Sequence, residues 1–322
     1  MRRRNFLTLA GLAALSTVVA APLATAADWP DKPVKLIVPY GPGGASDILA
    51  RPWAELLSQA YGQQFVVENR GGAGGMIGTE AAFKAAPDGY TLLFTPNATL
   101  TVLPSLRKTP YDPAKFEPVA RTGDIISGFV IHPSVGVKTF QEMIAYAKKN
   151  PGKLSYGSAG LGTATQLRVE ALKLKAGIDI LHVPYRGSAD ALNDLLPGTV
   201  QMMNEINVLP HVRAGKLILL NINHTARHPD FPDVPTLTEL GVKDADVPIW
   251  YSIWGPPGLP KDIVQKLNHK VIEIAKSESM IKRMRALNTE VPIQTPEEVG
   301  SYRETDTVRN AEIIKAGNIK LE

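Results

Sequence analysis

The stretch Val34–Asp47, which reads VKLIVPYGPGGASD, contains the pattern that decides the fold. Its first part, residues 34–39, is short, apolar and rich in β-branched side chains, and it predicts a buried strand. Its second part, Tyr40–Asp47, is a glycine-rich loop. Apolar residues then recur at helical spacing from Ile48 to Ala60, and Gly62 ends the helix. A strand, a glycine-rich loop and a helix in this order are typical of an α/β protein.

The same order of elements recurs directly afterwards. A strand is expected over residues 64–68, a second glycine-rich loop over 69–75, a helix over 77–86 and a third strand over 90–94. Because strands joined through helices run parallel with right-handed crossovers, these elements predict a parallel sheet.

A second series of elements follows from residue 123. Strands are expected at 123–132, 153–157, 180–183, 200–203 and 216–221, and helices at 139–150, 163–177 and 189–196. Thr139 and Thr163 are each expected to open a capping box, and Ser188 to be the N-cap of the third helix. The last third is more helical, with helices over 260–276 and from Thr295, which opens a further capping box.

The chain has 322 residues, which suits two domains rather than one core. We expect each domain to be a parallel-dominated sheet flanked by helices, with a ligand cleft between the domains. Residues 27–124 plus 248–322 are predicted to form domain 1, and residues 125–247 domain 2. The chain would then cross between the domains near residues 121–129 and 246–254.

Residues 1–26 are predicted to be an export signal that directs the protein to the periplasm. Three arginines, Arg2–Arg4, precede a mostly apolar stretch over 7–21, and Ala24-Thr25-Ala26 matches a cleavage site. The run RRNFL at 3–7 also resembles a twin-arginine signal, the alternative being a Sec signal with an extra arginine. The apolar stretch is shorter than the roughly 20 residues that span a bilayer, which disfavours a membrane anchor.

Composition excludes several classes of function. Without the three arginines of residues 1–26, the chain has 32 basic and 31 acidic residues, which gives a net charge of +1. It has no stripe of basic residues that would indicate binding to nucleic acid. The chain has no cysteine, which excludes disulfides, thiolate metal sites and cysteine nucleophiles. With 44% apolar and 20% charged residues, the mature chain is expected to be globular and soluble.

Three loops lie between the end of a predicted strand and the start of a helix, at residues 40–47, 158–163 and 185–188. In open α/β sheets, ligands bind at the carboxyl ends of the strands. Glycines expose backbone N–H groups there, and a helix N-terminus adds partial positive charge, so the loops predict a carboxylate or phosphate site. The alternative for any single loop is a tight turn. Asp47 either contacts the ligand or caps its helix, and Arg186 either pairs with a carboxylate or is solvated.

Enzymatic and cofactor sites are less well supported. Gly157-Ser158-Ala159-Gly160 resembles a nucleophile elbow without its first glycine, so an exported serine hydrolase using Ser158 is an alternative function. It requires a histidine and an acid near Ser158. His224 and His228 have metal-ligand spacing but no intervening glutamate, and no metal is expected. Residues 72–78 only approach a dinucleotide fingerprint, so no cofactor is expected.

Seven motifs, in order, resemble one family. They are PYGPGGASD at 39–47, VENRGGAGG at 67–75, APDGYTL at 86–92, PGKLSYGSAG at 151–160, HVPYRGS at 182–188, AGKL at 214–217 and PDVPT at 232–236. Together they resemble the substrate-binding proteins of tripartite tricarboxylate transporters, the Bug family, over essentially the whole mature chain.

The resemblance implies a type II-like periplasmic-binding-protein fold whose two domains close on a ligand. It implies a monomer that has no enzymatic activity. The ligand would be a small carboxylate, either a di- or tricarboxylate or an aromatic acid, delivered to one large and one small integral membrane subunit. A periplasmic sensor that presents its ligand to a signalling receptor is an alternative.

Carried onto this sequence, the resemblance and the loop pattern predict a set of ligand-binding residues: Tyr40, Gly41, Gly43, Gly44, Ser46, Asp47, Asn97, Ser158, Ala159, Gly160, Gly162, Thr163, Tyr185, Gly187, Ser188 and Asn204. One position departs from the family, in which an Asp commonly follows the strand at Val200; here residues 203–207 read MNEIN. Asn204 would make this position neutral, which disfavours an amino acid as ligand. Trp250, Tyr251 and Trp254 are expected to pack in the hinge or core, or to stack on an aromatic acid.

Overall fold

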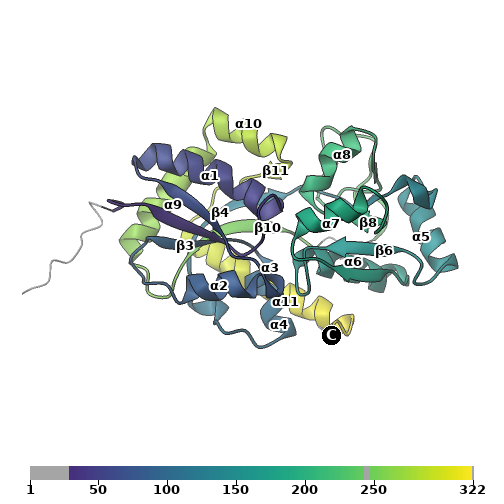
Figure 1. The fold of residues 1–322 in the computed structure, drawn as a ribbon, viewed down its shortest axis with the longest axis horizontal. Helices are drawn as coiled ribbons and strands as arrows, with labels where there is room; N and C mark the ends of the chain where they lie inside the picture. The colour runs from purple at the N-terminus through teal and green to yellow at the C-terminus, as the bar shows by residue number, and fades with distance from the viewer. Residues whose placement is uncertain (1–28, 243–246, 321–322) are drawn as a thin grey trace, which may run out of the picture.

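The computed structural model describes residues 29–242 and 247–320, and the predicted export signal lies outside them. Two α/β domains lie side by side along the long axis of the molecule (Figure 1). One holds a six-stranded sheet and the other a five-stranded sheet. This arrangement confirms the predicted two-domain α/β fold.

The six-stranded sheet takes its strands from both ends of the chain. Its order is β11 (Thr289–Glu290), β4 (Glu117–Ile125), β10 (Trp250–Gly255), β3 (Thr91–Pro96), β1 (Val34–Val38) and β2 (Phe65–Asn69). β1 pairs in parallel with β2 and β3, as predicted, but β10 is antiparallel to both β3 and β4, and β11 is antiparallel to β4. The sheet is therefore mixed rather than parallel-dominated. The reason is that the chain leaves this domain along β4 and returns along β10 beside it.

The five-stranded sheet is also mixed. Its order is β7 (Leu181–Pro184), β6 (Ser155–Ser158), β8 (Met202–Met203), β5 (Val130–Ile131) and β9 (Ile218–Leu219). β6 pairs in parallel with β7 and β8, whereas β5 is antiparallel to β8 and β9. The single strand predicted over 123–132 is wrong, because β4 and β5 belong to different sheets.

Helices cover both sheets (Figure 1). In the first domain they are α1 (Ala45–Tyr61), α2 (Met76–Phe83), α3 (Ala98–Thr101), α4 (Leu103–Leu106), α9 (Lys261–Ala275), α10 (Glu278–Ala286) and α11 (Pro296–Ala316). In the second they are α5 (Phe140–Lys149), α6 (Ala164–Ala176), α7 (Ser188–Leu195) and α8 (Leu209–Arg213). Short 3-10 turns occur at η1 (Ala73–Gly75), η2 (Pro113–Lys115), η3 (Pro133–Val135) and η4 (Ile206–Val208).

Two of the three predicted capping boxes form. Thr139 and Thr295 each accept from the backbone N–H three residues on, and the glutamate there accepts from the threonine N–H. At α6, Thr163 accepts from the N–H of Gln166, but the Gln166 side chain accepts from Gly162, so this N-cap has no reciprocal bond. Ser188 is not an N-cap: α7 begins at Ser188 itself, after Gly187.

Arg168 connects α6 to both segments that cross between the domains. Its side chain is fully buried. Nε and Nη2 donate to the carbonyl oxygen of Val247 at 2.9 and 2.7 Å, and Nη1 donates to the hydroxyl of Ser127 at 2.9 Å. Because Ser127 follows β4 and Val247 precedes β10, the guanidinium holds the two crossings together.

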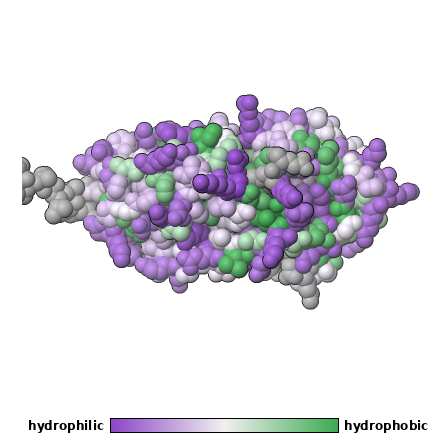
Figure 2. All heavy atoms as spheres, turned by 90° about the horizontal axis from the view of Figure 1, so that it is seen from below, coloured by the Kyte–Doolittle hydropathy of each residue, from purple (hydrophilic) through white to green (hydrophobic). Residues whose placement is uncertain are grey.

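The described surface is mainly hydrophilic on the face shown in Figure 2. Within residues 29–242 and 247–320, no helix combines the length and apolar character needed to cross a bilayer.

Candidate ligand-binding site

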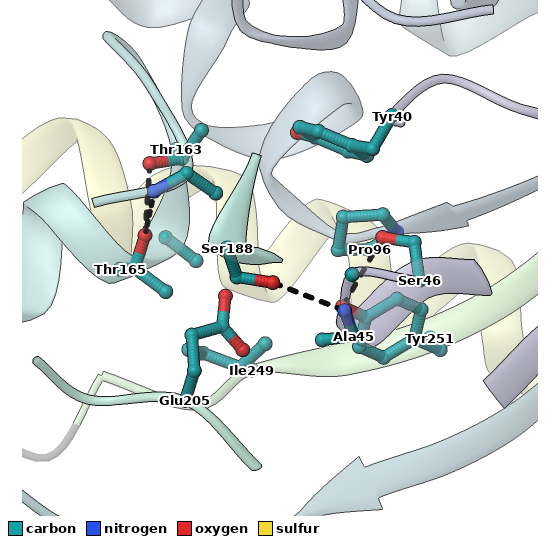
Figure 3. Close-up of a pocket in the computed structure, with 13 residues that line it drawn as sticks. Tyr40, Ala45, Ser46, Pro96, Thr163, Thr165, Ser188, Glu205, Ile249 and Tyr251 are labelled. Atoms are coloured by element: carbon teal, nitrogen blue, oxygen red, sulfur yellow. Dashed lines mark hydrogen bonds between the residues drawn. The ribbon is translucent and has the colours of Figure 1, made fainter. Parts of the chain in front are cut away.

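A hollow lies where the two domains meet (Figure 3). Its empty volume is about 370 Å³, including the part that is open to solvent. It is lined by Tyr40, Gly44, Ala45, Ser46, Pro96, Ile249 and Tyr251 from the first domain, and by Ala159, Thr163, Ala164, Thr165, Ser188 and Glu205 from the second.

Three helices from the two domains begin at this hollow. Ala45 and Ser46 start α1, Ala164 and Thr165 start α6, and Ser188 starts α7. The first N–H groups of an α-helix have no acceptor within the helix, and the helix dipole places partial positive charge at the same end. The convergence of three such ends favours an anionic group in the hollow.

Ser188 joins two of these helix starts across the domain boundary. Its Oγ accepts a hydrogen bond of 3.0 Å from the backbone N–H of Ala45. A Cβ atom on the neighbouring Gly44 would lie 3.2 Å from the same Oγ, so the glycine permits this close approach. The structure therefore has its domains in contact around the hollow.

A second contact between the domains closes the site at the glycine-rich loops. A Cβ atom on Gly74 would lie only 2.2 Å from the carbonyl oxygen of Leu161, so the two backbones touch there. Gly74 also has φ +67°, a left-handed conformation that favours glycine. Tyr40 also holds this loop in place, since its Oη donates a hydrogen bond to the Gly74 carbonyl oxygen at 3.0 Å.

Two hydroxyl groups remain as donors toward a ligand. Tyr251 Oη accepts from Ser46 Oγ at 3.3 Å, and Ser188 Oγ accepts from Ala45, so the proton of each of these hydroxyls is left for another acceptor. Burial raises the pKa of Tyr251 well above its usual value, so this phenol stays protonated. Sequence reasoning assigned Tyr251 to packing or stacking; the structure places it in the wall of the hollow, and Trp250 and Trp254 in the core.

Among the residues that the structure describes, Glu205 is the one that brings a carboxyl group to the lining of the hollow. Only 4% of the residue is exposed, and its Oε2 has no hydrogen-bond partner in the described part of the chain. Burial raises the pKa of Glu205 to about 7, although the nearby Arg168 charge opposes this. Asn204 alone was considered in the sequence argument against an amino acid ligand, whereas the structure places the carboxyl group of the next residue, Glu205, in the wall of the hollow.

Asn204 and Glu205 are neighbours in the chain, but their side chains lie in different surroundings. Asn204 is fully buried, donates from its Nδ2 to the carbonyl oxygen of Thr165 at 2.9 Å and does not line the hollow. Side chains alternate in extended chain, so Glu205, next to Asn204, faces the opposite way. A choice between Asn204 and Glu205 from the sequence would have required the exact end of β8.

Six of the predicted ligand residues line the hollow: Tyr40, Gly44, Ser46, Ala159, Thr163 and Ser188. Ten do not: Gly41, Gly43, Asp47, Asn97, Ser158, Gly160, Gly162, Tyr185, Gly187 and Asn204. Sequence reasoning missed Ala45, Pro96, Ala164, Thr165, Glu205 and Ile249. Gly41, Gly187 and Arg186 instead line a separate, more open hollow nearby.

Several of the ten have structural partners that explain their position. Asp47 accepts from the N–H of Gly43 at 3.0 Å and from Arg51, so it connects the first turn of α1 to the glycine-rich loop before it. Asn97 donates to Asp306 at 2.8 Å in the core. Tyr185 donates to Asp194 at 2.7 Å.

Ser158 has one of the two partners that a hydrolase requires. Its Oγ lies 2.7 Å from Nε2 of His182. Ser158 is fully buried and does not line the hollow, and in the described residues no acid is hydrogen-bonded to His182. Burial also lowers the pKa of His182 to about 4. The pair thus lacks both the acid and the access to substrate of a catalytic triad.

Comparison with known proteins agrees with this geometry. The family described as "Tripartite tricarboxylate transporter family receptor" matches residues 49–319. BugT of Bordetella pertussis is 33% identical over 330 residues, covering 100% of both chains. Rpa4515 of R. palustris, solved with adipate, is 32% identical with a TM-score of 0.87, covering 91% of this chain and 99% of that one. MatC of Rhodopseudomonas palustris, solved with bound malate, is 29% identical with a TM-score of 0.84, covering 89% of this chain and 100% of that one.

The family match extends over most of the chain, and the relatives align with it nearly end to end. The two-domain α/β fold agrees with the structures of those relatives. The chain therefore belongs to the solute-binding receptors of the tripartite tricarboxylate transporter family, the family of the Bug proteins.

Proposed function

We propose that this protein captures a small carboxylate between its two domains in the periplasm and delivers it to a tripartite tricarboxylate-type transporter with one large and one small membrane subunit. The observation that carries the proposal is the convergence of the first turns of α1, α6 and α7 on one hollow. The export signal expected at residues 1–26 supports the location.

A carboxylate suits the hollow better than a neutral solute. Three helix starts supply backbone N–H groups and partial positive charge, and Ser188 and Tyr251 add hydroxyl donors. The relatives solved with adipate and malate bind ligands of this chemical class, which supports the same class here.

Capture would depend on closure of the domains. The Ser188–Ala45 bond and the Gly74–Leu161 contact join the two domains, so both exist only when the domains are together. A ligand that touches helix starts of both domains adds to these contacts and shifts the population toward the closed form. The closed form of a monomer is then the species that the membrane subunits recognise.

Titration calorimetry and thermal shift of the chain from residue 27 against a panel of carboxylates test the proposal. The panel contains di- and tricarboxylates, aromatic acids and acidic amino acids, with the matching amides and amines as controls. An acid at one hundred times its Kd is expected to add about 2.7 kcal/mol to the free energy of unfolding. A shift with amides or amines equal to that with the acids would contradict an anion site.

Delivery needs a separate experiment in cells. Uptake of the acid identified in the panel is compared in a strain with and without this gene, both carrying the two membrane subunits. Uptake is expected to require the binding protein. Unchanged uptake together with a lost transcriptional response would instead indicate the sensor role.

A further inference from the structure

In the described lining of the hollow, hydrogen-bond donors are accompanied by a side-chain acceptor without a partner, Oε2 of Glu205. The helix starts at the hollow and the hydroxyls of Ser188 and Tyr251 can all donate to a ligand. The carboxyl group of Glu205 lines the same space and is the exception. In Figure 3 it points into the hollow, beside Ser188.

The carboxyl group of Glu205 is only partly satisfied in the described part of the chain, where the backbone N–H of Ile206 and the charge of Arg168 act on it. The residue is the N-cap of η4, with extended φ −133° and ψ 166°, yet its side chain makes no capping hydrogen bond. Its Oε2 is buried without a partner. A buried carboxylate oxygen without a hydrogen-bond donor is costly, and a bound group that supplies a donor removes this cost.

Neighbouring groups do not supply the missing donor. Tyr40 gives its phenol proton to the Gly74 carbonyl. Arg168 donates to Val247 and Ser127, and it acts on Glu205 through its charge. An unsatisfied oxygen that lines a binding hollow is therefore available to the ligand.

We propose that the ligand carries, beside its carboxylate, an O–H or N–H donor that binds to Glu205, so that Glu205 selects hydroxy or amino acids over plain carboxylic acids. This inference rests on the proposed capture of a carboxylate. A hydroxyl or ammonium group would satisfy Oε2, whereas a plain carboxylate placed there would bring oxygen against oxygen. A site built to hold a ligand O–H or N–H discriminates strongly against the analogue that lacks it, because the buried group is then left unpaired.

The test uses sets of three acids that differ only in the donor. Succinate, malate and aspartate form one set, and glutarate and adipate with their 2-hydroxy and 2-amino forms give two more. Binding to the chain from residue 27 is measured by calorimetry at pH 8, where Glu205 is ionised. We expect one donor-bearing acid to bind about tenfold or more tighter than its plain analogue.

The Glu205→Gln variant then separates this inference from the general one. Binding of the preferred acid should weaken about tenfold or more, while the plain analogue should bind as well as before or better. Glu273→Gln, which removes one charge from an exposed glutamate, should change neither. If donor-bearing and plain acids bind the wild-type protein equally well, the Glu205 assignment is overturned and carboxylate capture stands. If none of the acids in the full carboxylate panel binds, carboxylate capture fails and the Glu205 assignment with it.

A pH series on the wild-type protein gives a second measurement that does not depend on the variant folding. In the described residues, the titratable or charged groups that act on Glu205 or are acted on by it are Arg168 on α6, Tyr40 after β1 and Tyr251 on β10. Burial raises the pKa of both tyrosines, so they stay neutral. Affinity for the donor-bearing acid should therefore rise from pH 6 to pH 8 as Glu205 ionises and becomes a better acceptor. A fall over this range would mean that protonated Glu205 donates to the ligand, and it would overturn the proposal.

Discussion

The hydroxyl oxygen of Ser188 accepts a hydrogen bond of 3.0 Å from the backbone N–H of Ala45, although 143 residues separate them and they lie in different domains. Each residue starts a helix that faces the ligand hollow. In the proposed capture, closure of the domains would therefore bring these two helix starts together and complete the anion site at this point.

Ser188→Ala should weaken ligand binding about three- to tenfold, because a neutral hydrogen bond contributes about 1 kcal/mol net. The closed form loses this bond and the ligand loses a hydroxyl donor, while the domains themselves stay folded. Calorimetry with the ligand found in the carboxylate panel gives the ratio of Kd values. The exposed Ser105→Ala is the matched control and should change neither Kd nor Tm. Equal affinity in Ser188→Ala and wild type would show that the bond has no role in capture.

Gly74→Ala should impair closure more severely. The new methyl group would lie 2.2 Å from the Leu161 carbonyl oxygen, so the loops must separate. We expect affinity to fall about tenfold or more, since a clash of this kind costs over 1 kcal/mol. Small-angle scattering should show less compaction on adding ligand than in wild type.

Gly136→Ala is the control for backbone strain in that experiment. Gly136 has a similar left-handed conformation, φ +79°, but nothing lies within 4 Å of its Cβ position. It should cost about 1 kcal/mol of stability without changing affinity. A similar loss of affinity in both variants would attribute the effect to strain rather than to the loop contact.

Glu205→Gln should stabilise the ligand-free protein at neutral pH. The folded pKa of about 7 lies above the ordinary value of 4.5. Below pH 4.5 the carboxyl is protonated in both states, and between pH 4.5 and 7 the unfolded chain releases its proton first. The free energy of unfolding of the wild-type protein therefore falls as pH rises through this window, by about 2–3 kcal/mol. Glutamine removes this dependence.

Thermal melts of both proteins from pH 4.5 to 8 measure that effect. The Tm of the variant should exceed that of wild type increasingly as pH rises, and the two should agree near pH 4.5. A constant difference at all pH values would mean that Glu205 does not titrate in this window.

Arg168→Met should destabilise the protein by about 3–5 kcal/mol, because it leaves the Val247 carbonyl and the Ser127 hydroxyl buried without their donor. Urea unfolding followed by circular dichroism measures the loss. The exposed Arg107→Met should stay within about 0.5 kcal/mol of wild type. A similarly small loss in Arg168→Met would mean that the crossings hold together without the guanidinium.

The local elements could be predicted from the sequence because local signals specify them. The apolar run at 34–38, the glycine-rich loop after it and Gly62 predict β1, the loop and α1 closely. The position of β10 between β3 and β4 could not be predicted in the same way. It depends on pairing between segments more than a hundred residues apart, and no local pattern encodes that pairing.

The site was partly predictable for the same reason. Loops at strand ends were predicted to form it, and Tyr40, Ser46, Thr163 and Ser188 do line it. Asn204 was selected from the sequence, whereas Glu205 lines the hollow, because neighbouring residues of an extended segment face opposite ways. The partner of Ser188 was missed because its alternative, a cap on its own helix, is the commoner local arrangement.

The central place of β10 has a consequence for how the chain is made. Residues 250–255 leave the ribosome after every strand of the second domain, whose strands lie between 130 and 219. Until then β3 and β4 each lack the neighbour that joins them, and open strand edges invite pairing with other chains. The second domain can therefore complete its sheet during synthesis, whereas the first domain must wait for the late segment, and a nascent chain is most exposed to aggregation in the interval between the two.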